Sequence, residues 1–207
     1  MRVGILGGTF DPIHYGHLRL AEEARERLSL ERVLFIPNQV SPFKDADEVS
    51  PGALRLEMVR LATAGNGAFT ASGVELERPG PSYTVETLRR LRAERPGDEL
   101  FFLTGTDLLG GLTGWREPEA VLELARFVTL TRPGAGDDFA RALEALPEAW
   151  RPKIRYLESP GLEISSTHLR DLARGRHSLR YLAPDPVVDF VEARGLYRTG
   201  NGGAMGV

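Results

Sequence analysis

The chain has 207 residues, of which 42% are hydrophobic and 27% charged, values that are typical of a soluble globular protein of one domain. Its formal net charge of −3 argues against nucleic-acid binding through bulk electrostatics, and the absence of cysteine excludes disulfides and cysteine-based metal or redox sites. No apolar run approaches the roughly 20 residues of a membrane span, so we expect a cytoplasmic protein that binds no membrane.

The first part of the chain predicts a strand, a glycine turn and a helix. Residues 2–6 are apolar and bounded by glycines, which indicates a short buried strand. Gly7 and Gly8 follow, and glycine lets a bulky anion approach the backbone. His14 and His17 stand where the next helix begins, beside its free N–H groups and partial positive charge. The apolar face of that helix has four members, Leu20, Ala21, Ala24 and Leu28. We interpret this junction as a phosphate site.

Each feature of this junction also has an ordinary explanation. A histidine near a helix start is often a cap or a packed ring, and two histidines three residues apart can bind zinc, although the chain has no cysteine to complete a common zinc site. The combination of a strand, Gly-Gly, Thr9 and then His-x-Gly-His favours phosphate binding over these alternatives.

Alternating strands and helices are predicted along the rest of the chain. Apolar runs indicate strands at 32–37, 69–78, 99–104, 127–131 and 153–157. Start and stop signals indicate helices at 51–64, from 82–84 onward, at 138–146, from 165 onward and at 184–194. This alternation predicts a Rossmann-like α/β fold with a mainly parallel sheet and helices on both faces. We expect one domain over 1–198 and a flexible tail over 199–207.

Polar residues gather at the predicted strand ends, where open α/β sheets bind ligands. Lys44 follows the second strand and is either a solvated loop lysine or a phosphate contact. Ser82 and Thr84 precede a helix that they either cap or equip for binding. Asp107 follows the strand at 99–104 and either caps the next helix or belongs to the site.

Two further segments carry candidate binding residues. Trp115 lies in a glycine-rich loop, where its ring either packs in the core or stacks on a planar ligand. Three hydroxyl residues at 165–167 open a helix, which is more than one cap uses. Arg170 falls on the same helix face as Ser166, one turn later, so the two form a candidate polyphosphate clamp.

The order of these motifs resembles that of the bacterial nicotinate-nucleotide adenylyltransferase family, within the His-x-Gly-His nucleotidylyltransferase superfamily. The resemblance rests on Gly-Gly-Thr-Phe-Asp-Pro-x-His-x-Gly-His at 7–17, Ser-Pro-x-Lys at 41–44, Gly-Pro-Ser-Tyr-Thr at 80–84, Gly-x-Asp at 105–107, the tryptophan at 115, Arg-Pro-Gly at 132–134, Ile-Ser-Ser-Thr-x-x-Arg at 164–170 and the closing segments at 181–185 and 195–197. One departure is Phe43, where many relatives carry histidine, so any role of that histidine is absent here.

The resemblance implies an enzyme of NAD biosynthesis that transfers the AMP moiety of ATP to nicotinate mononucleotide and releases pyrophosphate. It implies catalytic roles for His14 and His17, and Mg²⁺ bound with ATP rather than in a metal site of the protein. The implied ATP-binding residues are Gly8, Thr9, Phe10, His14, His17, Gly105, Asp107, Ile164, Ser165, Ser166 and Arg170. The implied mononucleotide-binding residues are Thr9, Lys44, Ser82, Tyr83, Thr84, Trp115 and Arg132.

The choice of pyridine gives a sharper expectation. No lysine or arginine lies within 82–84, so we expect Thr84 and the backbone N–H groups of that helix start to bind the nicotinate carboxylate, with the Trp115 ring stacked on the pyridine. Nicotinate mononucleotide should then be preferred over nicotinamide mononucleotide. The sequence leaves open whether the chain forms a homo-oligomer.

Three other classes of protein fit these motifs less well. Pantetheine-phosphate adenylyltransferases share the first and last motifs, but the Ser-Tyr-Thr and tryptophan segments are not their pattern. A class I aminoacyl-tRNA synthetase needs an anticodon-binding region for which no residues remain. A dehydrogenase-like domain or dinucleotide sensor is expected to carry Gly-x-Gly-x-x-Gly, which the glycines at positions 4, 7 and 8 do not form, and has no use for His-x-Gly-His.

Overall fold

The computed structural model describes residues 1–39, 49–78, 80–131 and 136–198, and within these ranges the chain alternates strands and helices. The strands are β1 (Arg2–Gly8), β2 (Arg32–Pro37), β3 (Phe69–Ala71), β4 (Glu99–Gly105), β5 (Arg126–Thr131) and β6 (Ile154–Glu158). The α-helices are α1 (Tyr15–Arg27), α2 (Gly52–Thr63), α3 (Thr84–Glu94), α4 (Thr106–Leu109), α5 (Pro118–Leu124), α6 (Gly136–Glu144), α7 (Ser166–Arg174) and α8 (Asp185–Arg194). Two 3₁₀ turns complete the description, η2 (Leu112–Gly114) and η3 (Glu148–Lys153). None of the helices in these ranges is long and apolar enough to span a membrane.

The strands form one six-stranded sheet in the order β3-β2-β1-β4-β5-β6, and every pair is parallel. This confirms the predicted Rossmann-like α/β fold. The chain builds outward from β1 to β3 and then returns to place β4 on the other side of β1. Because the strand order reverses between β1 and β4, their carboxyl ends leave a crevice in which sheets of this kind bind ligands.

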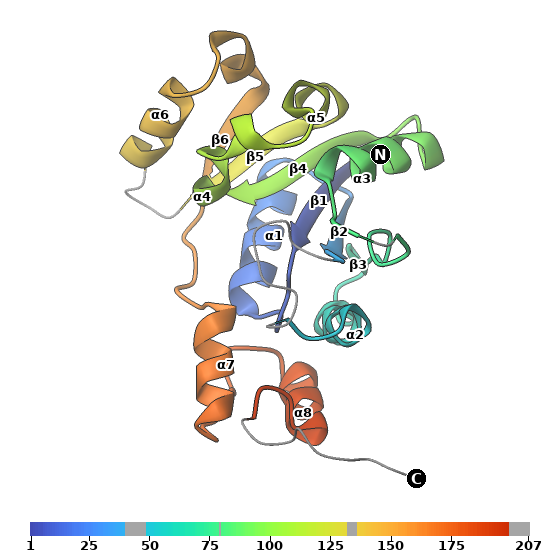
Figure 1. Cartoon of the computed structure of the whole chain (residues 1–207), viewed down its shortest axis with the longest axis vertical. Helices are drawn as coiled ribbons and strands as arrows, with labels where there is room; N and C mark the ends of the chain where they lie inside the picture. Colours follow the sequence, from blue (N-terminus) through green and yellow to red (C-terminus); the bar gives the residue numbers. More distant parts are fainter. Residues whose placement is uncertain (40–48, 79, 132–135, 199–207) are drawn as a thin grey trace.

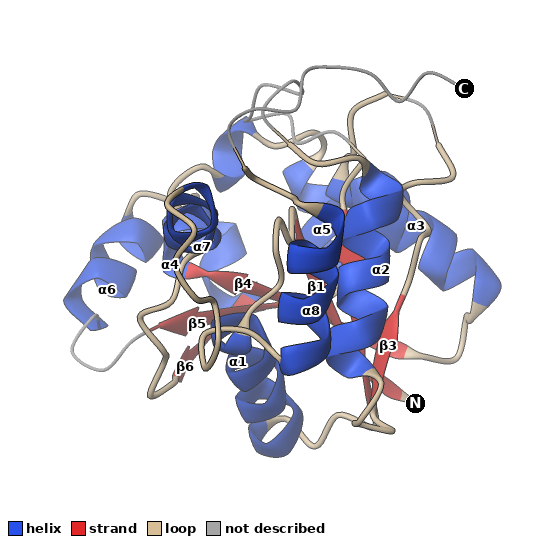
Figure 2. Cartoon of the chain, turned by 90° about the horizontal axis from the view of Figure 1, so that it is seen from below, coloured by secondary structure: helices blue, strands red, loops and turns tan. Residues whose placement is uncertain are grey.

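The core lies in two layers, one on each face of the sheet, because successive strand residues point to opposite faces. On one face Phe35, Phe101 and Leu103 pack against side chains of α1, α2, α7 and α8. On the other face Ile5 and Phe102 pack against side chains of α3, α5 and the segment around η3. Helices on both faces are seen in Figures 1 and 2. A fully parallel sheet needs this double cover, and the uninterrupted apolar strands of the sequence reflect it.

The last two helices lie together at one end of the molecule, below α1 and α2 in Figure 1. Helix α8 packs against α2, and the two are neighbours in Figure 2 as well. Leu169 of α7 and Val187 of α8 belong to the same buried cluster as Ala21 of α1 and Met58 of α2. These helices therefore extend the core of the sheet. The assignment of 1–198 to a single domain stays a prediction, and the tail at 199–207 lies outside the described residues.

The predicted strand at 69–78 is wrong beyond Ala71. The chain turns at Gly73, whose carbonyl accepts a 2.8 Å hydrogen bond from the Leu76 N–H group. Val74 and Glu75 are consecutive and both buried, so the alternation of apolar and acidic residues did not reflect two faces of a strand. Helix α5 was missed, although Pro118 occupies the first helical turn, where proline is tolerated.

Candidate active site

The loop between β1 and α1 is buried and tightly folded. Phe10 adopts a left-handed backbone conformation with φ of 51°, and the peptide between Asp11 and Pro12 is cis. The Phe10 ring turns back toward the glycine turn, so a Cβ on Gly8 would lie only 3.1 Å from it. Glycine at position 8 is therefore a packing requirement as well as an opening to ligands.

The two histidines of the motif face each other at the start of α1. Their rings are stacked with centroids 3.7 Å apart, and the Phe10 ring meets the His17 ring edge-on at 5.0 Å. The His14 backbone N–H donates to His17 Nδ1 at 3.3 Å. Since Nδ1 accepts this hydrogen bond, the proton of a neutral His17 ring is on Nε2. The hydrogen bond from the His14 backbone thus leaves Nε2 as the donor atom of a neutral His17 ring.

His14 is the more deeply buried of the pair, with 5% of its surface exposed. Burial lowers the pKa of the His14 imidazole to about 4, so the ring is neutral at neutral pH. Its Nδ1 has no hydrogen-bond partner among the described residues, an uncommon state for a buried polar atom. This Nδ1 is enclosed at the start of α1, where His14 is the N-cap, so the ring can offer a ligand only its other nitrogen, Nε2.

The close packing around position 16 explains why the His-x-Gly-His motif has glycine there. A Cβ at this position would stand 2.9 Å from His14 Nδ1 and 3.5 Å from the Ile164 carbonyl oxygen. Ile164, a predicted ATP-binding residue, therefore lies beside the histidine motif in the structure. Any side chain larger than hydrogen at position 16 displaces the His14 ring.

Helix α7 is anchored to the histidine loop. Ser166 Oγ donates to the Pro12 carbonyl at 2.9 Å, and the Arg170 guanidinium donates to the Asp11 carbonyl at 2.8 Å. Ser165 Oγ accepts from the His168 N–H at 3.1 Å, so this hydroxyl is the helix cap. The structure thus brings Ser166 and Arg170 to the histidine loop across more than 150 residues of sequence.

A cavity of about 350 Å³ opens beside the same loop, at the carboxyl ends of β1 and β2. Six of the predicted site residues line it, Gly8, Thr9, Ser82, Tyr83, Thr84 and Trp115. Gly8 belongs to the predicted ATP set and Thr9 to both predicted sets. The other four are residues expected to bind the mononucleotide. The cavity is mostly apolar with a few polar groups, the composition of a small-molecule site.

Trp115 fits both interpretations that its sequence left open. Its ring packs edge-on against Phe102 at 5.8 Å and against Phe127 at 6.0 Å, and it also lines the cavity. Tyr83, which also lines the cavity, lies under the Arg116 guanidinium, whose central carbon is 4.7 Å from the ring centroid. Arg116 pairs with Glu86 at 2.8 Å. An aromatic ring fixed by two others is a rigid surface for a planar ligand.

Helix α3 begins at the cavity wall. Tyr83 is its N-cap, and the first helical hydrogen bonds run from the Glu86 and Thr87 N–H groups to the Tyr83 carbonyl. Because the N–H groups of Thr84 and Val85 come before these bonds, they have no partner within the helix. Ser82 Oγ is engaged, since it accepts a 2.9 Å hydrogen bond from the Gln39 N–H.

Sequence reasoning missed two charged residues of the cavity, Glu75 and Arg116. The Glu75 carboxylate accepts a 2.7 Å hydrogen bond from the Thr87 hydroxyl, and burial raises the pKa of the Glu75 carboxyl. Glu75 was not identified because the strand wrongly predicted at 69–78 placed it on a polar face. Arg116 directly follows Trp115 in the sequence, and its place next to a predicted site residue could have identified it as a candidate.

A cluster of buried polar residues supports the histidine loop, and the sequence predicted no role for any of them. The Asp11 carboxylate is 2% exposed and accepts hydrogen bonds from the Tyr197 hydroxyl at 2.6 Å and from the Ser50 N–H at 3.0 Å. Burial and the neighbouring Asp11 charge raise the pKa of Tyr197, so its hydroxyl remains a donor. Arg55 lies beside them, fully enclosed.

The structure describes the remaining predicted site residues only in part. Gly105 ends β4 and precedes α4, at the carboxyl edge of the sheet as expected. The Asp107 backbone lies in α4, and its side chain is outside the described residues, as are Lys44 and Arg132. In the part of the chain that the structure describes, no group of three or more His, Asp or Glu side chains gathers as a metal site.

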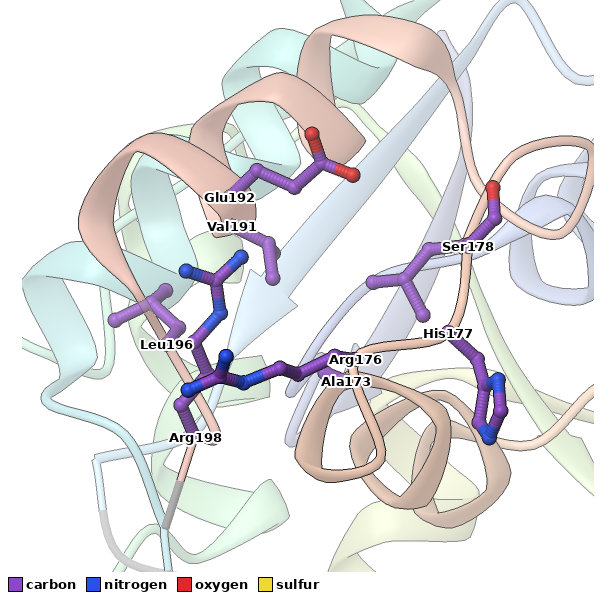
Figure 3. A pocket seen from close by; sticks show the side chains of 9 residues that line it. Ala173, Arg176, His177, Ser178, Val191, Glu192, Leu196 and Arg198 are labelled. Carbon is purple, nitrogen blue, oxygen red and sulfur yellow. The ribbon is translucent and has the colours of Figure 1, made fainter. Parts of the chain in front are cut away.

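A second hollow, of about 240 Å³, lies between α7 and α8 (Figure 3). The Arg176 side chain extends across it toward Arg198, with Glu192 on the facing helix. None of the predicted site residues lines this hollow. The chemistry of the sequence motifs therefore belongs to the cleft at the carboxyl edge of the sheet.

Comparison with known families agrees with this location. A family model described as cytidylyltransferase-like matches residues 5–172. The match begins within β1 and ends within α7, so it includes the histidine loop, the cavity and the helix that carries Ser166 and Arg170.

Relatives match over nearly the whole chain. A protein of Roseiflexus sp. (strain RS-1) named "Probable nicotinate-nucleotide adenylyltransferase" is 48% identical over 197 residues, which cover 95% of this chain and 98% of the relative. A protein of the same name from Symbiobacterium thermophilum is 46% identical and covers 96% of each chain. A solved structure, the Plasmodium falciparum nicotinic acid mononucleotide adenylyltransferase complexed with NaAD, has a TM-score of 0.74 at 18% identity, with 95% of this chain and 97% of that chain covered. At that identity the structural likeness shows the fold alone.

Proposed function

The chain belongs to the cytidylyltransferase-like family and, within it, to the nicotinate-nucleotide adenylyltransferases, and we propose that the histidine loop and the cavity beside it are the two halves of its active site. The enzyme transfers the AMP moiety of ATP to nicotinate mononucleotide, giving nicotinate adenine dinucleotide and pyrophosphate. One observation carries the assignment of the two halves. Gly8 and Thr9 line the cavity and also begin the loop that ends in the two histidines.

The histidine half holds the ATP phosphates. His17 presents an Nε2 donor, and the neutral His14 ring lies stacked against it. Arg170 brings a positive charge to the same loop, next to Ser166. Donors fixed before the reaction stabilise charge that develops on the α-phosphate and on the departing pyrophosphate. Phe10, Gly105, Asp107, Ile164 and Ser165 complete the proposed ATP site.

The cavity half holds the mononucleotide, with its pyridine against Trp115 and its carboxylate at the start of α3. An oxygen of the mononucleotide phosphate attacks the α-phosphorus of ATP in line, the new P–O bond forms, and the bond to the β-phosphate oxygen breaks as pyrophosphate leaves. No covalent intermediate on the protein is needed, so catalysis is positioning and charge stabilisation. Lys44 and Arg132 remain predicted contacts of the mononucleotide.

Magnesium fits this site as an ion carried by ATP. The described residues offer no cage of carboxylates and histidines, and Mg²⁺ is commonly held by nucleotide phosphates and water with few protein ligands. When bound it neutralises phosphate charge. A cytoplasmic location stays a prediction of the sequence, which leaves open whether the chain forms a homo-oligomer.

The assignment is tested by ATP-dependent pyrophosphate release with a panel of acceptors. Nicotinate mononucleotide, nicotinamide mononucleotide and 4′-phosphopantetheine are compared at equal concentration. The account expects the highest kcat/KM for nicotinate mononucleotide, because the amide analogue leaves buried donors at the α3 start badly paired. Release that depends on phosphopantetheine instead contradicts the account. Equal use of both pyridine mononucleotides contradicts the proposed role of the α3 start alone.

A further inference from the structure

Arg55, in the first turn of α2, is an arginine whose guanidinium lies inside the protein with 1% of its surface exposed. It donates five hydrogen bonds, all to neutral oxygens. Nε reaches the Ser50 carbonyl at 2.8 Å, and one terminal nitrogen reaches the Thr9 carbonyl at 2.8 Å and Asn38 Oδ1 at 3.3 Å. The other terminal nitrogen reaches the carbonyls of Asn38 at 2.7 Å and Gln39 at 3.3 Å.

These acceptors belong to three segments. Two other hydrogen bonds also link them, from the Asn38 N–H to the Gly8 carbonyl at 3.0 Å and from the Ser50 N–H to the Asp11 carboxylate at 3.0 Å. Thr9 follows β1, Asn38 and Gln39 follow β2, and Ser50 precedes α2. Thr9 and Asn38 line the cavity, and the Gln39 N–H donates to the Oγ of Ser82, which lines it as well. Arg55 therefore joins two segments that supply lining residues of the cavity, the one after β1 and the one after β2.

Enclosing this charge is costly, which argues that the bonds matter. Burial lowers the pKa of Arg55, and the nearby Asp11 carboxylate opposes that shift. The two charges share Ser50, whose carbonyl accepts from Arg55 and whose N–H donates to Asp11. A buried charge is tolerated only when its hydrogen bonds are satisfied and a counter-charge is near, and both conditions hold here.

We propose that Arg55 is a positioning residue for the mononucleotide, an inference that rests on the proposed function. Three of its five bonds hold Asn38 and Gln39, on the cavity side. The histidine loop has further anchors, because Ser166 holds Pro12 and Arg170 holds Asp11. Loss of Arg55 removes three hydrogen bonds from Asn38 and Gln39 but one from Thr9. The cavity side therefore loses more than the histidine loop, which keeps the bonds from α7.

The test is Arg55→Lys, with Arg92→Lys as the matched control. Lysine keeps the charge but concentrates its donors at one point, so it cannot span three segments. Arg92 also holds backbone carbonyls, those of Leu124 at 2.9 Å and Asp98 at 2.7 Å, but at the amino end of the sheet. Arg55→Gln is the second variant, with amide donors and no buried charge.

Steady-state kinetics with each substrate varied separately show whether Arg55 affects the mononucleotide more than ATP. Arg55→Lys and Arg55→Gln are expected to raise the KM for nicotinate mononucleotide about tenfold or more, as the loss of buried hydrogen bonds predicts, and the KM for ATP less than about threefold. Arg92→Lys is expected to lower the melting temperature and change neither KM.

Three results overturn the proposal. They are unchanged KM values in both Arg55 variants, equal rises for the two substrates, and failure of both variants to fold while Arg92→Lys folds. Wild-type enzyme is assayed alongside. If it shows no release that depends on nicotinate mononucleotide, the proposed function itself fails, which is distinct from each of these results.

Discussion

Gly16→Ala is the substitution for which the structure gives the sharpest expectation. Gly16 is the second residue of α1, and its φ is not in the left-handed region, so alanine fits the backbone. The new methyl would lie 2.9 Å from His14 Nδ1, closer than ordinary packing allows. The His14 ring is buried and stacked on His17 at 3.7 Å, so it moves only by disturbing that stack.

Two effects of opposite sign compete in this variant. Alanine favours a helix over glycine by up to about 1 kcal/mol, which raises the free energy of unfolding. Displacement of the His14 ring weakens its packing and lowers the free energy of unfolding by a similar amount. We therefore expect a small net change in stability. A misplaced phosphate donor costs about 3 kcal/mol in the transition state, a loss of about 100-fold in kcat. The expected result is therefore a folded protein with poor turnover.

The assay is pyrophosphate release at saturating ATP and nicotinate mononucleotide, together with thermal unfolding. Gly65→Ala is the control, because nothing lies within 4 Å of a Cβ at that position. Its kcat should match wild type. The reasoning is refuted if Gly16→Ala has wild-type kcat and higher stability, since helix propensity alone would then describe the position.

Three further predictions follow from the site. Arg170→Ala should raise the KM for ATP more than the KM for the mononucleotide, since Arg170 stands at the histidine loop; equal loss for both substrates in steady-state kinetics would point to a role in folding. Trp115→Ala should weaken both pyridine mononucleotides and leave ATP nearly unchanged, as binding titrations can show, and an equal effect on ATP would contradict ring stacking. The lowered pKa of His14, about 4 against an ordinary 6.5, means that the unfolded chain binds more protons between these values, so stability should fall as pH drops from 6.5 to 4. The loss attributable to His14 is up to about 3 kcal/mol, and urea unfolding of His14→Asn should lack it; an identical pH dependence in that variant would refute the assignment.

The sequence predicted the sheet well because its strands are buried on both faces. Apolar runs such as 32–37 and 99–104 have no other explanation in a chain of alternating strands and helices, and both became strands. The strand predicted at 69–78 failed for a related reason. Val74 and Glu75 are buried together in a turn, and the Thr87 hydroxyl that satisfies the glutamate comes from α3, beyond the reach of a local pattern.

The motif residues were identified from their order, but the residues that support them were not. His14 and His17 belong to one short segment, so the sequence alone predicts that they lie close together. Asp11, Arg55 and Tyr197 come from distant parts of the chain, and no local pattern indicates that their side chains meet. They are buried because α2 and the segment after α8 pack against the histidine loop. Only the tertiary structure reveals that arrangement.

His17→Ala tests the central claim, that the histidine loop stabilises the transferring phosphate, most directly. The measurement is kcat for AMP transfer at saturating ATP and nicotinate mononucleotide, with the melting temperature recorded on the same preparation. Removing one preorganised donor to developing phosphate charge should lower kcat by about 100- to 1,000-fold with the fold intact. A variant that keeps near wild-type kcat and only melts earlier would contradict the claim and make the histidine pair a structural feature of α1.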